Sequence, residues 1–293
     1  MVIAMKFRSA LIRLFTKIAG PNKSINDTQY TNMIYWIAFG KIPNLKNPRT
    51  FNEHICAIRI SDQCYDYAPY ADKAAVRDYV ANTVGDRYLN KLIGVYESPY
   101  DIPFDRLPEA FAMKCTHASG YNVVVPDKKK VDWNKTTRKF ERWLSRNYYY
   151  VNRERNYKHI QPRILIDEYI RFDKRLLEYK VFCFNGHVRF TSVNVFEGGR
   201  RSVSVYEREW QYIPVNMGYE SLGDSIPKPE NYDEMIQVAE KLAAPFSFVR
   251  VDLYNDGKII LFSELTFTSG GGLVRIWPEA YNLQWGSFFE DLQ

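Results

Sequence analysis

The chain has 293 residues, of which 46% are hydrophobic and 25% are charged, with 15 glycines and 14 prolines. This composition is typical of a globular protein and excludes a disordered chain, a collagen and a disulfide-rich miniprotein. The formal net charge of +6 favours anionic partners such as nucleotides, acidic polymers or a membrane surface, but it is too small to indicate nucleic acid binding.

The four cysteines, Cys56, Cys64, Cys115 and Cys183, show no short paired spacing such as C-x-x-C. Neither a zinc site nor a disulfide framework is therefore indicated. We expect reduced, mostly buried thiols in a cytoplasmic protein.

The first 20 residues predict a basic amphipathic helix. Apolar residues alternate with Lys6, Arg8, Arg13 and Lys17, and Gly20-Pro21-Asn22 ends the segment. The internal charges argue against a signal peptide, and no apolar run reaches the ~18 to 20 residues of a membrane-spanning helix. Two alternatives remain open: attachment to an anionic membrane face, and docking on the body of the protein itself, which is the commoner role of such helices.

The remaining pattern changes near residue 108. Residues 21–107 are helical and turn-rich, with a clear helix over 71–80, whereas strands separated by turns follow. Asn185-Gly186 is a strong hairpin signal. We predict strands over 111–115, 121–125, 163–170, 177–184, 187–193, 248–254 and 258–267, a basic helix from residue 135, and a helix over 232–242 with Asn231 as its N-cap. This order of elements is typical of an α+β fold.

The last predicted hairpin places charged residues in the middle of apolar strands. Arg250 and Asp252 alternate with apolar residues on one strand, and Glu264 and Thr266 do so on its partner. A carboxylate in an apolar strand must be solvated, paired or bound to a metal. Two carboxylates and a hydroxyl suit Mg²⁺, whereas a salt bridge from Arg250 to one of the acids explains the pattern equally well.

The expected register complicates the metal site. A simple hairpin about residues 255–257 sets Asp252 opposite a residue near 260, about 13 Å from Glu264 along the strand. Shared binding of one ion therefore requires a bulge, a strong twist or two ions.

Two lysines also lie within predicted apolar strands, Lys114 just before the loop at 116–120 and Lys180 in the middle of 177–184. A phosphate between them explains both, because an ammonium group is a compact charge and the small residues of the loop let backbone N–H groups approach an anion. The alternative for each lysine is an edge strand from which it reaches water. His117 in the loop is a candidate hydrogen-bond donor to an anionic oxygen.

Basic residues are densest in Lys128-Lys129-Lys130 and in the helix from Lys135 to Arg146. A solvated helix face is one explanation, and contact with a polyanion, an acidic polysaccharide or membrane phosphate is the other. Arg200-Arg201 offers a second possible anion site.

Several of these segments match the motifs of one known family in consistent order. They are Phe51-Asn52-Glu53-His54-Ile55, Asp72-Lys73-x-x-Val76-Arg77-x-Tyr79-Val80, Phe111-x-x-Lys114-Cys115-x-His117-x-Ser119-Gly120, Asp167-Glu168-Tyr169, Tyr179-Lys180-x-Phe182-Cys183-Phe184-Asn185-Gly186, and Arg250-Val251-Asp252-Leu253-Tyr254 with Glu264-Leu265-Thr266-Phe267. From about Phe51 to Gly271 the chain resembles the TupA-like ATP-grasp family. ATP-grasp enzymes clamp ATP between two α+β subdomains.

The resemblance implies roles for several of the matched residues, and the chain also departs from the wider family pattern. Thr266 stands where many ATP-grasp enzymes have Asn, and the loop has Thr116 and Ala118 where Asn and Gly are expected. The implied ATP contacts are Lys114, Lys180, the phosphate-covering loop of His117, Ala118, Ser119 and Gly120, and the hinge residues Asp167 and Glu168. The implied Mg²⁺ ligands are Asp252, Glu264 and Thr266. The implied catalytic residues are Arg250, Lys180 and His117.

The resemblance also implies domains and a reaction. We expect the helix at 1–20, an N-terminal region at 21–107, a small ATP-grasp subdomain at 108–170 and a C-terminal subdomain with the metal site at 171–293. The expected enzyme is an ADP-forming ligase that uses ATP and Mg²⁺ to join a uronic acid carboxylate of a surface (capsular) polysaccharide, or of its precursor, to an amino acid or other amine through an acyl phosphate.

Two alternatives to the ligase remain. One is a non-catalytic glycan-binding or assembly factor, and the other is a glycosyltransferase, against which the absence of a D-x-D motif counts. We expect a cytoplasmic location at the inner face of the membrane, contact with capsule assembly proteins, and no nucleic acid partner.

Overall fold

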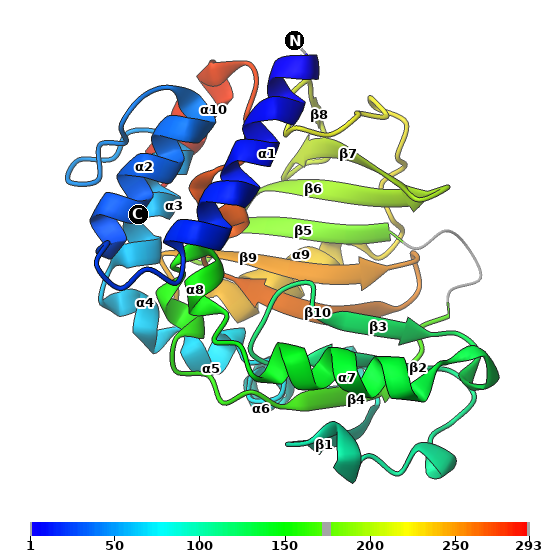
Figure 1. Cartoon of the computed structure of the whole chain (residues 1–293). Helices are drawn as coiled ribbons and strands as arrows, with labels where there is room; N and C mark the ends of the chain where they lie inside the picture. Colours follow the sequence, from blue (N-terminus) through cyan, green and yellow to red (C-terminus); the bar gives the residue numbers. More distant parts are fainter. Residues whose placement is uncertain (1, 172–176, 292–293) are drawn as a thin grey trace.

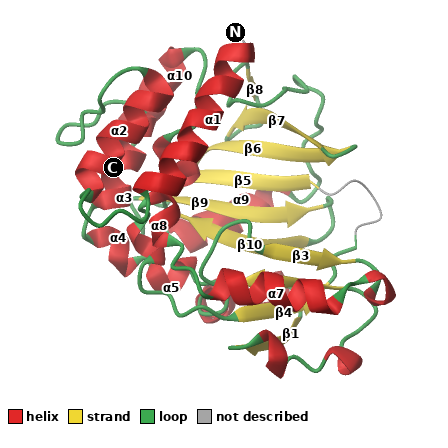
Figure 2. Ribbon diagram, in the orientation of Figure 1, coloured by secondary structure: helices red, strands yellow, loops and turns green. Residues whose placement is uncertain are grey.

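The strands form two separate antiparallel sheets in the computed structural model, which describes residues 2–171 and 177–291, with side chains from residue 8 onward (Figure 1, Figure 2). The strands are β1 (Leu92–Tyr96), β2 (Phe111–Cys115), β3 (Asn122–Val125), β4 (Ile164–Glu168), β5 (Leu177–Phe184), β6 (His187–Glu197), β7 (Arg200–Glu207), β8 (Tyr212–Ile213), β9 (Phe248–Asn255) and β10 (Ile260–Thr266). The predicted α+β class is confirmed.

Helices cover both sheets and fill the N-terminal region. They are α1 (Val2–Ala19), α2 (Asp27–Phe39), α3 (Phe51–Ile60), α4 (Gln63–Asp66), α5 (Ala68–Ala71), α6 (Val76–Val84), α7 (Trp133–Leu144), α8 (Tyr149–Asn152), α9 (Tyr232–Ala243) and α10 (Glu279–Ser287). Short 3₁₀ turns are η1 (Asp86–Tyr88), η2 (Pro99–Asp101), η3 (Phe104–Arg106), η4 (Lys128–Lys130), η5 (Arg155–Tyr157) and η6 (Ser269–Gly272).

The large sheet has the strand order β10-β9-β5-β6-β7-β8. Because side chains alternate along a strand, Tyr179, Val181 and Val251 point to one face, where they join the core beneath α9, the helix behind this sheet in Figure 1. The opposite face carries Phe182 and Phe248, which pack on α3 and α10, and beyond them the charged residues that the sequence singled out. The sheet therefore has one apolar face and one face that is polar at its centre.

The small sheet has the order β1-β4-β2-β3 and packs against α7, which lies in front of it in Figure 1. Phe111 and Met113 of β2 meet Phe140 of α7 in a core separate from that of the large sheet. Strand β1 pairs with β4, although β1 lies within the predicted N-terminal region 21–107. The predicted boundary at residue 107 thus passes between strands of one sheet.

Helix α1 confirms the predicted N-terminal helix, apart from Met1 and the side chains of residues 2–7, which lie outside the described part. Ile12 and Phe15 pack against Tyr30 of α2, so the helix docks on the body of the protein. No described helix is long and apolar enough to cross a membrane.

Two local predictions are wrong. The helix predicted over 71–80 begins only at Val76, because the Asp72 side chain accepts hydrogen bonds from Ala74 N and Ala75 N and holds a turn there. Asn231 precedes α9 as expected, but its side chain makes no capping hydrogen bond.

The predicted hairpin at Asn185-Gly186 is present, with both residues at positive φ as such a turn requires. The cysteines are free and buried as expected.

Candidate active site

A row of polar side chains crosses the centre of the large sheet. Glu264 lies opposite Asp252, Asp252 opposite Lys180, and Lys180 opposite Ser192, each pair on neighbouring strands from β10 to β6. Residues directly opposite each other on one face lie close enough to interact. The sheet therefore brings together residues from two hairpins, β5–β6 and β9–β10, that are far apart in the sequence.

The expected offset between Asp252 and Glu264 is wrong. The turn spans residues 256–259 rather than 255–257, because Asn255 already pairs with Ile260. An irregularity between Phe262 and Glu264 then shifts the register by one more residue. Such a bulge is one of the conditions that a shared metal site required.

Asp252 is the centre of this row and has no exposed surface. Its Oδ1 accepts a hydrogen bond from Arg250 Nε at 2.6 Å, and its Oδ2 accepts one from Lys180 Nζ at 2.5 Å and one from Arg250 Nη2 at 2.6 Å. Burial acts to raise the pKa of Asp252, but the charges of Arg250 and Lys180 more than offset burial and lower it. The carboxylate is thus held ionised between two cations.

Glu264 stands at the more exposed edge of the row. Its Oε1 accepts a hydrogen bond from Thr266 Oγ1 at 3.3 Å and lies 3.5 Å from Arg250 Nη2, and its Oε2 lies 3.8 Å from Lys73 Nζ. Lys73 also donates to Ala118 O at 2.8 Å. Lys73 therefore connects the acidic strand to the loop at 116–120.

The loop meets the large sheet through Ser119, which lines a cavity of about 230 Å³ together with groups from β5, β9 and β10. Gly120 has φ +73, a conformation that favours glycine. The cavity is lined by Ser119, Lys180, Phe182, Ser192, Arg201, Val203, Met217, Tyr219, Arg250, Glu264, Ser269, Gly270 and Val274.

His117 does not line this cavity. The side chain is buried, and its Nε2 lies 3.2 Å from Arg146 O and 3.3 Å from Trp143 O at the end of α7. Desolvation lowers the pKa of His117, so the neutral ring is favoured. The geometry favours a structural contact with α7 over the predicted contact with an anionic oxygen, which stays an untested prediction.

Lys114 and Asp167, both in the small sheet, form an ion pair of 2.9 Å. Asp167 is buried, and its Oδ1 has no hydrogen-bond partner within the described ranges. Glu168 points elsewhere and pairs with Lys91 at 2.6 Å on the surface. Neither Lys114 nor the two hinge candidates line the 230 Å³ cavity, so the structure divides the predicted ATP contacts between two sheets.

The glycine-rich turn after β10 is packed rather than open. A Cβ at Gly272 would lie 2.5 Å from Cys56 Sγ and 2.8 Å from Asn52 O of α3, so only glycine allows this approach. Arg59 Nη1 donates to Gly271 O at 2.8 Å. These contacts fix Ser269, whose Oγ accepts a hydrogen bond from Arg250 Nη1 at 3.0 Å.

The donor types fit a Mg²⁺ ion that is shared with phosphate, although both Asp252 oxygens are buried and already accept hydrogen bonds from Arg250 and Lys180. Asp252 and Glu264 offer carboxylate oxygens opposite each other, with Thr266 beside them, and Mg²⁺ takes one or two carboxylates plus phosphate oxygens and waters. The described residues contain no cluster of three or more His, Cys, Asp or Glu side chains suited to a metal. Protein ligands alone would not complete such a site, and phosphate would have to supply the rest.

Sequence reasoning missed several members of this network. Lys180 Nζ also pairs with Glu178 at 3.2 Å, and Asn194 Nδ2 donates to Glu178 Oε2 at 2.9 Å. Glu178 lies two residues before Lys180, so strand alternation alone places it on the same face. Lys73 belongs to a matched family motif, but strand alternation could not place it here, because it approaches Glu264 only through the tertiary fold.

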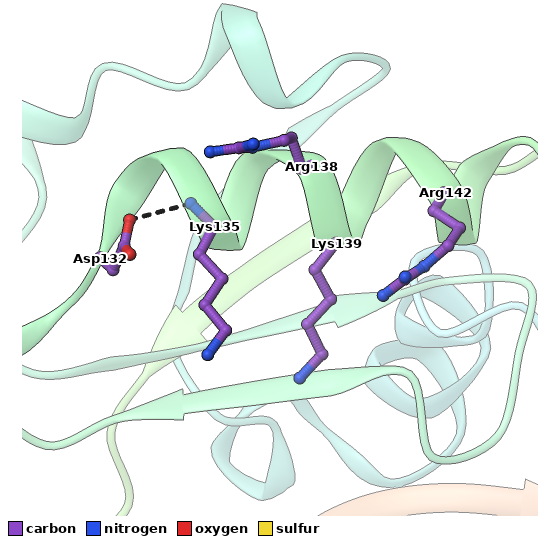
Figure 3. A pocket seen from close by; sticks show the side chains of 5 residues that line it. All are labelled: Asp132, Lys135, Arg138, Lys139 and Arg142. Carbon is purple, nitrogen blue, oxygen red and sulfur yellow. Dashed lines mark hydrogen bonds between the residues drawn. The ribbon is translucent and has the colours of Figure 1, made fainter.

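Helix α7 of the small-sheet region carries a stripe of basic side chains (Figure 3). Lys135, Arg138, Lys139 and Arg142 follow the i, i+3, i+4, i+7 spacing that places them on one helix face, and together with the N-cap Asp132 they line a shallow hollow of about 540 Å³. Like charges at these spacings destabilise a helix. An anion bound to this stripe would reduce the repulsion between its four positive charges.

The fold has two antiparallel sheets, and cations and carboxylates gather on the face of the larger sheet that is polar at its centre. This is the architecture of an ATP-grasp protein. The sequence profile of the TupA-like ATP-grasp family matches residues 53–290, and the chain belongs to this family. The predicted family, fold and enzyme class are thereby confirmed. No curated protein matches the sequence.

Solved structures of ATP-grasp enzymes resemble the chain at low identity. An L-amino acid ligase from Bacillus licheniformis is 14% identical with a TM-score of 0.48, and the match covers 83% of this chain and 56% of that one. A D-alanine–D-alanine ligase from Bacillus anthracis complexed with ATP is 11% identical with a TM-score of 0.41, covering 68% of this chain and 55% of that one. The chain thus spans about half the length of these structures.

Proposed function

We propose that the protein is an ATP-dependent carboxylate–amine ligase that forms an amide through an acyl phosphate and releases ADP. The observation that carries the proposal is the row of Glu264, Asp252 and Lys180. Glu264, Lys180 and the neighbouring Arg250 line a cavity that is also lined by Ser119, from the loop between β2 and β3 of the small sheet. Phosphoryl transfer needs positioned cations and a metal rather than a covalent nucleophile on the protein.

Each charged group has a role in this proposal. Lys180 and Arg250 bind phosphate oxygens and stabilise the charge of the phosphoryl group during its transfer. Asp252, Glu264 and Thr266 hold Mg²⁺, which when bound neutralises phosphate charge. In the absence of phosphate, the cations and carboxylates compensate each other, which explains why Asp252 is ionised although buried.

The small sheet supplies the other nucleotide contacts. Lys114 binds phosphate from the side opposite Lys180, and residues 117–120 cover the phosphates through the backbone and Ser119. Asp167 has a buried oxygen without a partner in the described ranges, which is an available acceptor for a nucleotide donor near the hinge.

The proposed acid substrate is a uronic acid carboxylate of a surface polysaccharide or its precursor, and the second substrate is an amino acid or other amine. The stripe on α7 supports an acidic polymer, because its four cations share one face and face solvent or are half-buried.

We further propose that the protein acts at the inner face of the membrane through α1 and α2. Leu14 and Ile18 of α1 are 55% and 64% exposed, and Trp36 of α2 is 59% exposed next to an apolar hollow. Lys17 and Arg13 flank these residues, as in helices that lie on anionic membranes.

Sedimentation with anionic vesicles tests this membrane contact. A Leu14→Glu/Ile18→Glu protein should sediment less than the wild type, whereas Leu283→Glu, which alters a 50% exposed leucine on α10, should not. Equal sedimentation of all three proteins would contradict the membrane contact.

The central experiment measures Mg-ATP binding and ADP release. A ligand that binds only the folded state raises the melting temperature, by the equivalent of about 2.7 kcal/mol at one hundred times its Kd. ADP release that depends on an acid and an amine supports the ligase. Binding of Mg-ATP without ADP formation would favour the non-catalytic glycan-binding factor instead.

A further inference from the structure

The two ends of the cavity differ in how their cations are compensated. At one end Lys180 and Arg250 both pair with Asp252. At the other end Arg201 extends from β7 into the same cavity, and no carboxylate in the described residues forms an ion pair with it. Arg201 is thus a positive charge for which the described residues provide no ion-pair partner.

Neutral groups hold Arg201 in place. Its Nη1 donates to Tyr219 Oη at 3.0 Å, its guanidinium carbon lies 4.1 Å from the centre of the Tyr219 ring, and its Nη2 donates to Asn194 Oδ1 at 3.0 Å. Its Nε is buried and has no acceptor in the described residues. A guanidinium has five N–H donors, so these two hydrogen bonds leave donors for an anion.

The two residues that bind the Arg201 side chain, Asn194 and Tyr219, are themselves held in place by the fold. Asn194 has no exposed surface and is itself fixed by its hydrogen bond to Glu178. The segment that carries Tyr219 is anchored on both sides, since Glu220 bridges to Ser202 and Asn216 pairs with Trp277. The guanidinium is therefore pre-organised, which favours bidentate binding of a carboxylate.

One carboxylate cannot occupy both ends of the cavity. Arg250 lies on β9 and Arg201 on β7, and β5 and β6 separate them, so their backbones lie roughly 14 Å apart or more. The carboxylate to be activated has to lie near Arg250 and Glu264, where the phosphoryl group is transferred. A second anionic group can then pair with Arg201, which is half-buried in the cavity wall.

Resting on the proposed ligase function, we infer that the acid substrate carries a second, non-reacting anionic group, which Arg201 binds. The class of ligand is an acidic glycan with a carboxylate on each of two neighbouring sugars. Tyr219 and Met217 line the cavity beside Arg201 and offer apolar surface to the C–H groups of a sugar ring. Arg201 is in this view a specificity residue and takes no part in phosphoryl transfer.

Calorimetric titration of the full chain tests the inference with galacturonate and digalacturonate as probes. Protein saturated with Mg-ADP should bind digalacturonate at least about tenfold more tightly than galacturonate, since a charge-assisted hydrogen bond contributes roughly 1.5–3 kcal/mol. Arg201→Gln should remove this preference, and Arg201→Lys should keep part of it, because a lysine retains the charge but not the planar fork.

Arg200→Gln is the matched control. Arg200 is exposed and alternates to the other face of β7, so this variant removes the same charge without changing the cavity and should keep the preference. Melting temperatures verify that each variant is folded.

The outcomes separate the inference from the proposed function. Wild-type protein that binds Mg-ADP but binds both probes equally, or binds no digalacturonate, overturns the inference. A loss of Mg-ADP affinity in Arg201→Gln also overturns it, because Arg201 would then belong to the nucleotide site. Wild-type protein that binds neither Mg-ADP nor Mg-ATP overturns the proposed function instead.

Discussion

Each sheet holds a lysine paired with an aspartate of the neighbouring strand, yet the two pairs differ in their surroundings. Lys114 and Asp167 in the small sheet lie 2.9 Å apart, and the lysine side chain is 24% exposed. Lys180 and Asp252 in the large sheet lie 2.5 Å apart with side chains 11% and 0% exposed. A pair that only binds an anion can stay partly solvated, whereas a pair beside the reacting phosphoryl group benefits from exclusion of water.

The two lysine–aspartate pairs also differ in the other residues that contact them. Arg250 donates to Asp252 and to Ser269, and Glu178 pairs with Lys180, so the large-sheet pair is part of a network. Among the described residues Asp167 forms an ion pair with Lys114 alone and interacts with Arg77 only electrostatically, and one of its oxygens has no hydrogen-bond partner there. We therefore expect the large-sheet pair to control the chemical step and the small-sheet pair to control nucleotide affinity.

The largest effect is expected for Lys180→Met. Loss of a positioned positive charge beside the phosphoryl group should lower kcat for ADP release by roughly 10²- to 10³-fold. The melting temperature should also fall, because Asp252 loses one of its two cations, although Arg250 still compensates it. Single-turnover ADP release and thermal unfolding without nucleotide measure the two effects, and near-normal kcat in the folded variant would contradict a catalytic role.

Glu264→Gln separates a metal ligand from a structural salt bridge. The variant removes the charge but keeps the volume, so ADP release should fall by orders of magnitude and recover in part at high Mg²⁺ concentration. Stability should change little, because the Glu264 side chain is 27% exposed and lies 3.5 Å from Arg250.

The opposite result for Glu264→Gln is equally clear. A large drop in melting temperature with normal turnover of the remaining folded protein would assign Glu264 to the structure, and the proposed metal site would be lost with it. Titration of Mg²⁺ at fixed ATP, in parallel with thermal unfolding, gives both values from one preparation.

A smaller effect on the chemical step is expected for Lys114→Met. This variant should raise KM for ATP by roughly tenfold and leave kcat within a few-fold, since a charge-assisted contact to phosphate is lost but the transferred group is not touched. Lys91→Met is a matched control, because Lys91 also pairs with a carboxylate of β4 but on the surface. Equal losses of kcat in the Lys114 and Lys180 variants would remove the distinction between the two sheets.

The sequence predicted four of the six strands of the large sheet, β5, β6, β9 and β10, whose segments are joined in pairs by clear turn signals. Strand β7 was missed although Val203 and Val205 alternate with polar residues, and β1 was missed because it is short and lies in a helical region. The two strands that carry Arg250, Asp252 and Glu264 drew attention because charged residues are unusual within apolar strands.

The geometry of the site was beyond sequence reasoning. Whether Glu264 faces Asp252 depends on one bulge, and a shift by one residue moves a side chain to the other face of a sheet. Lys73 reaches Glu264 only because the region before the small sheet folds back over the large one. His117 was placed at the phosphate by its loop, but the end of α7 determines where its ring lies.

The smallest effect on nucleotide binding is expected for His117→Gln, although His117 lies in the predicted phosphate loop. The glutamine amide still donates to the carbonyls of Trp143 and Arg146, so Mg-ADP affinity should change less than about threefold. A change of tenfold or more without loss of stability would return His117 to the phosphate site.

The pH dependence of stability sharpens this last prediction. Burial lowers the pKa of His117 below its ordinary value of 6.5, so below pH 6.5 the unfolded chain takes up a proton that the folded chain does not. Stability therefore falls as the pH drops from 6.5 to the lower pKa of the folded state. His54 adds a loss of the same sign, because burial lowers its pKa too. The His117→Gln variant should consequently lose less stability than the wild type between pH 7.5 and 5.5, as measured by urea unfolding. An identical loss in both proteins would mean that His117 is protonated as readily in the folded chain as in the unfolded one, and the structural role assigned to its contact with α7 would be wrong.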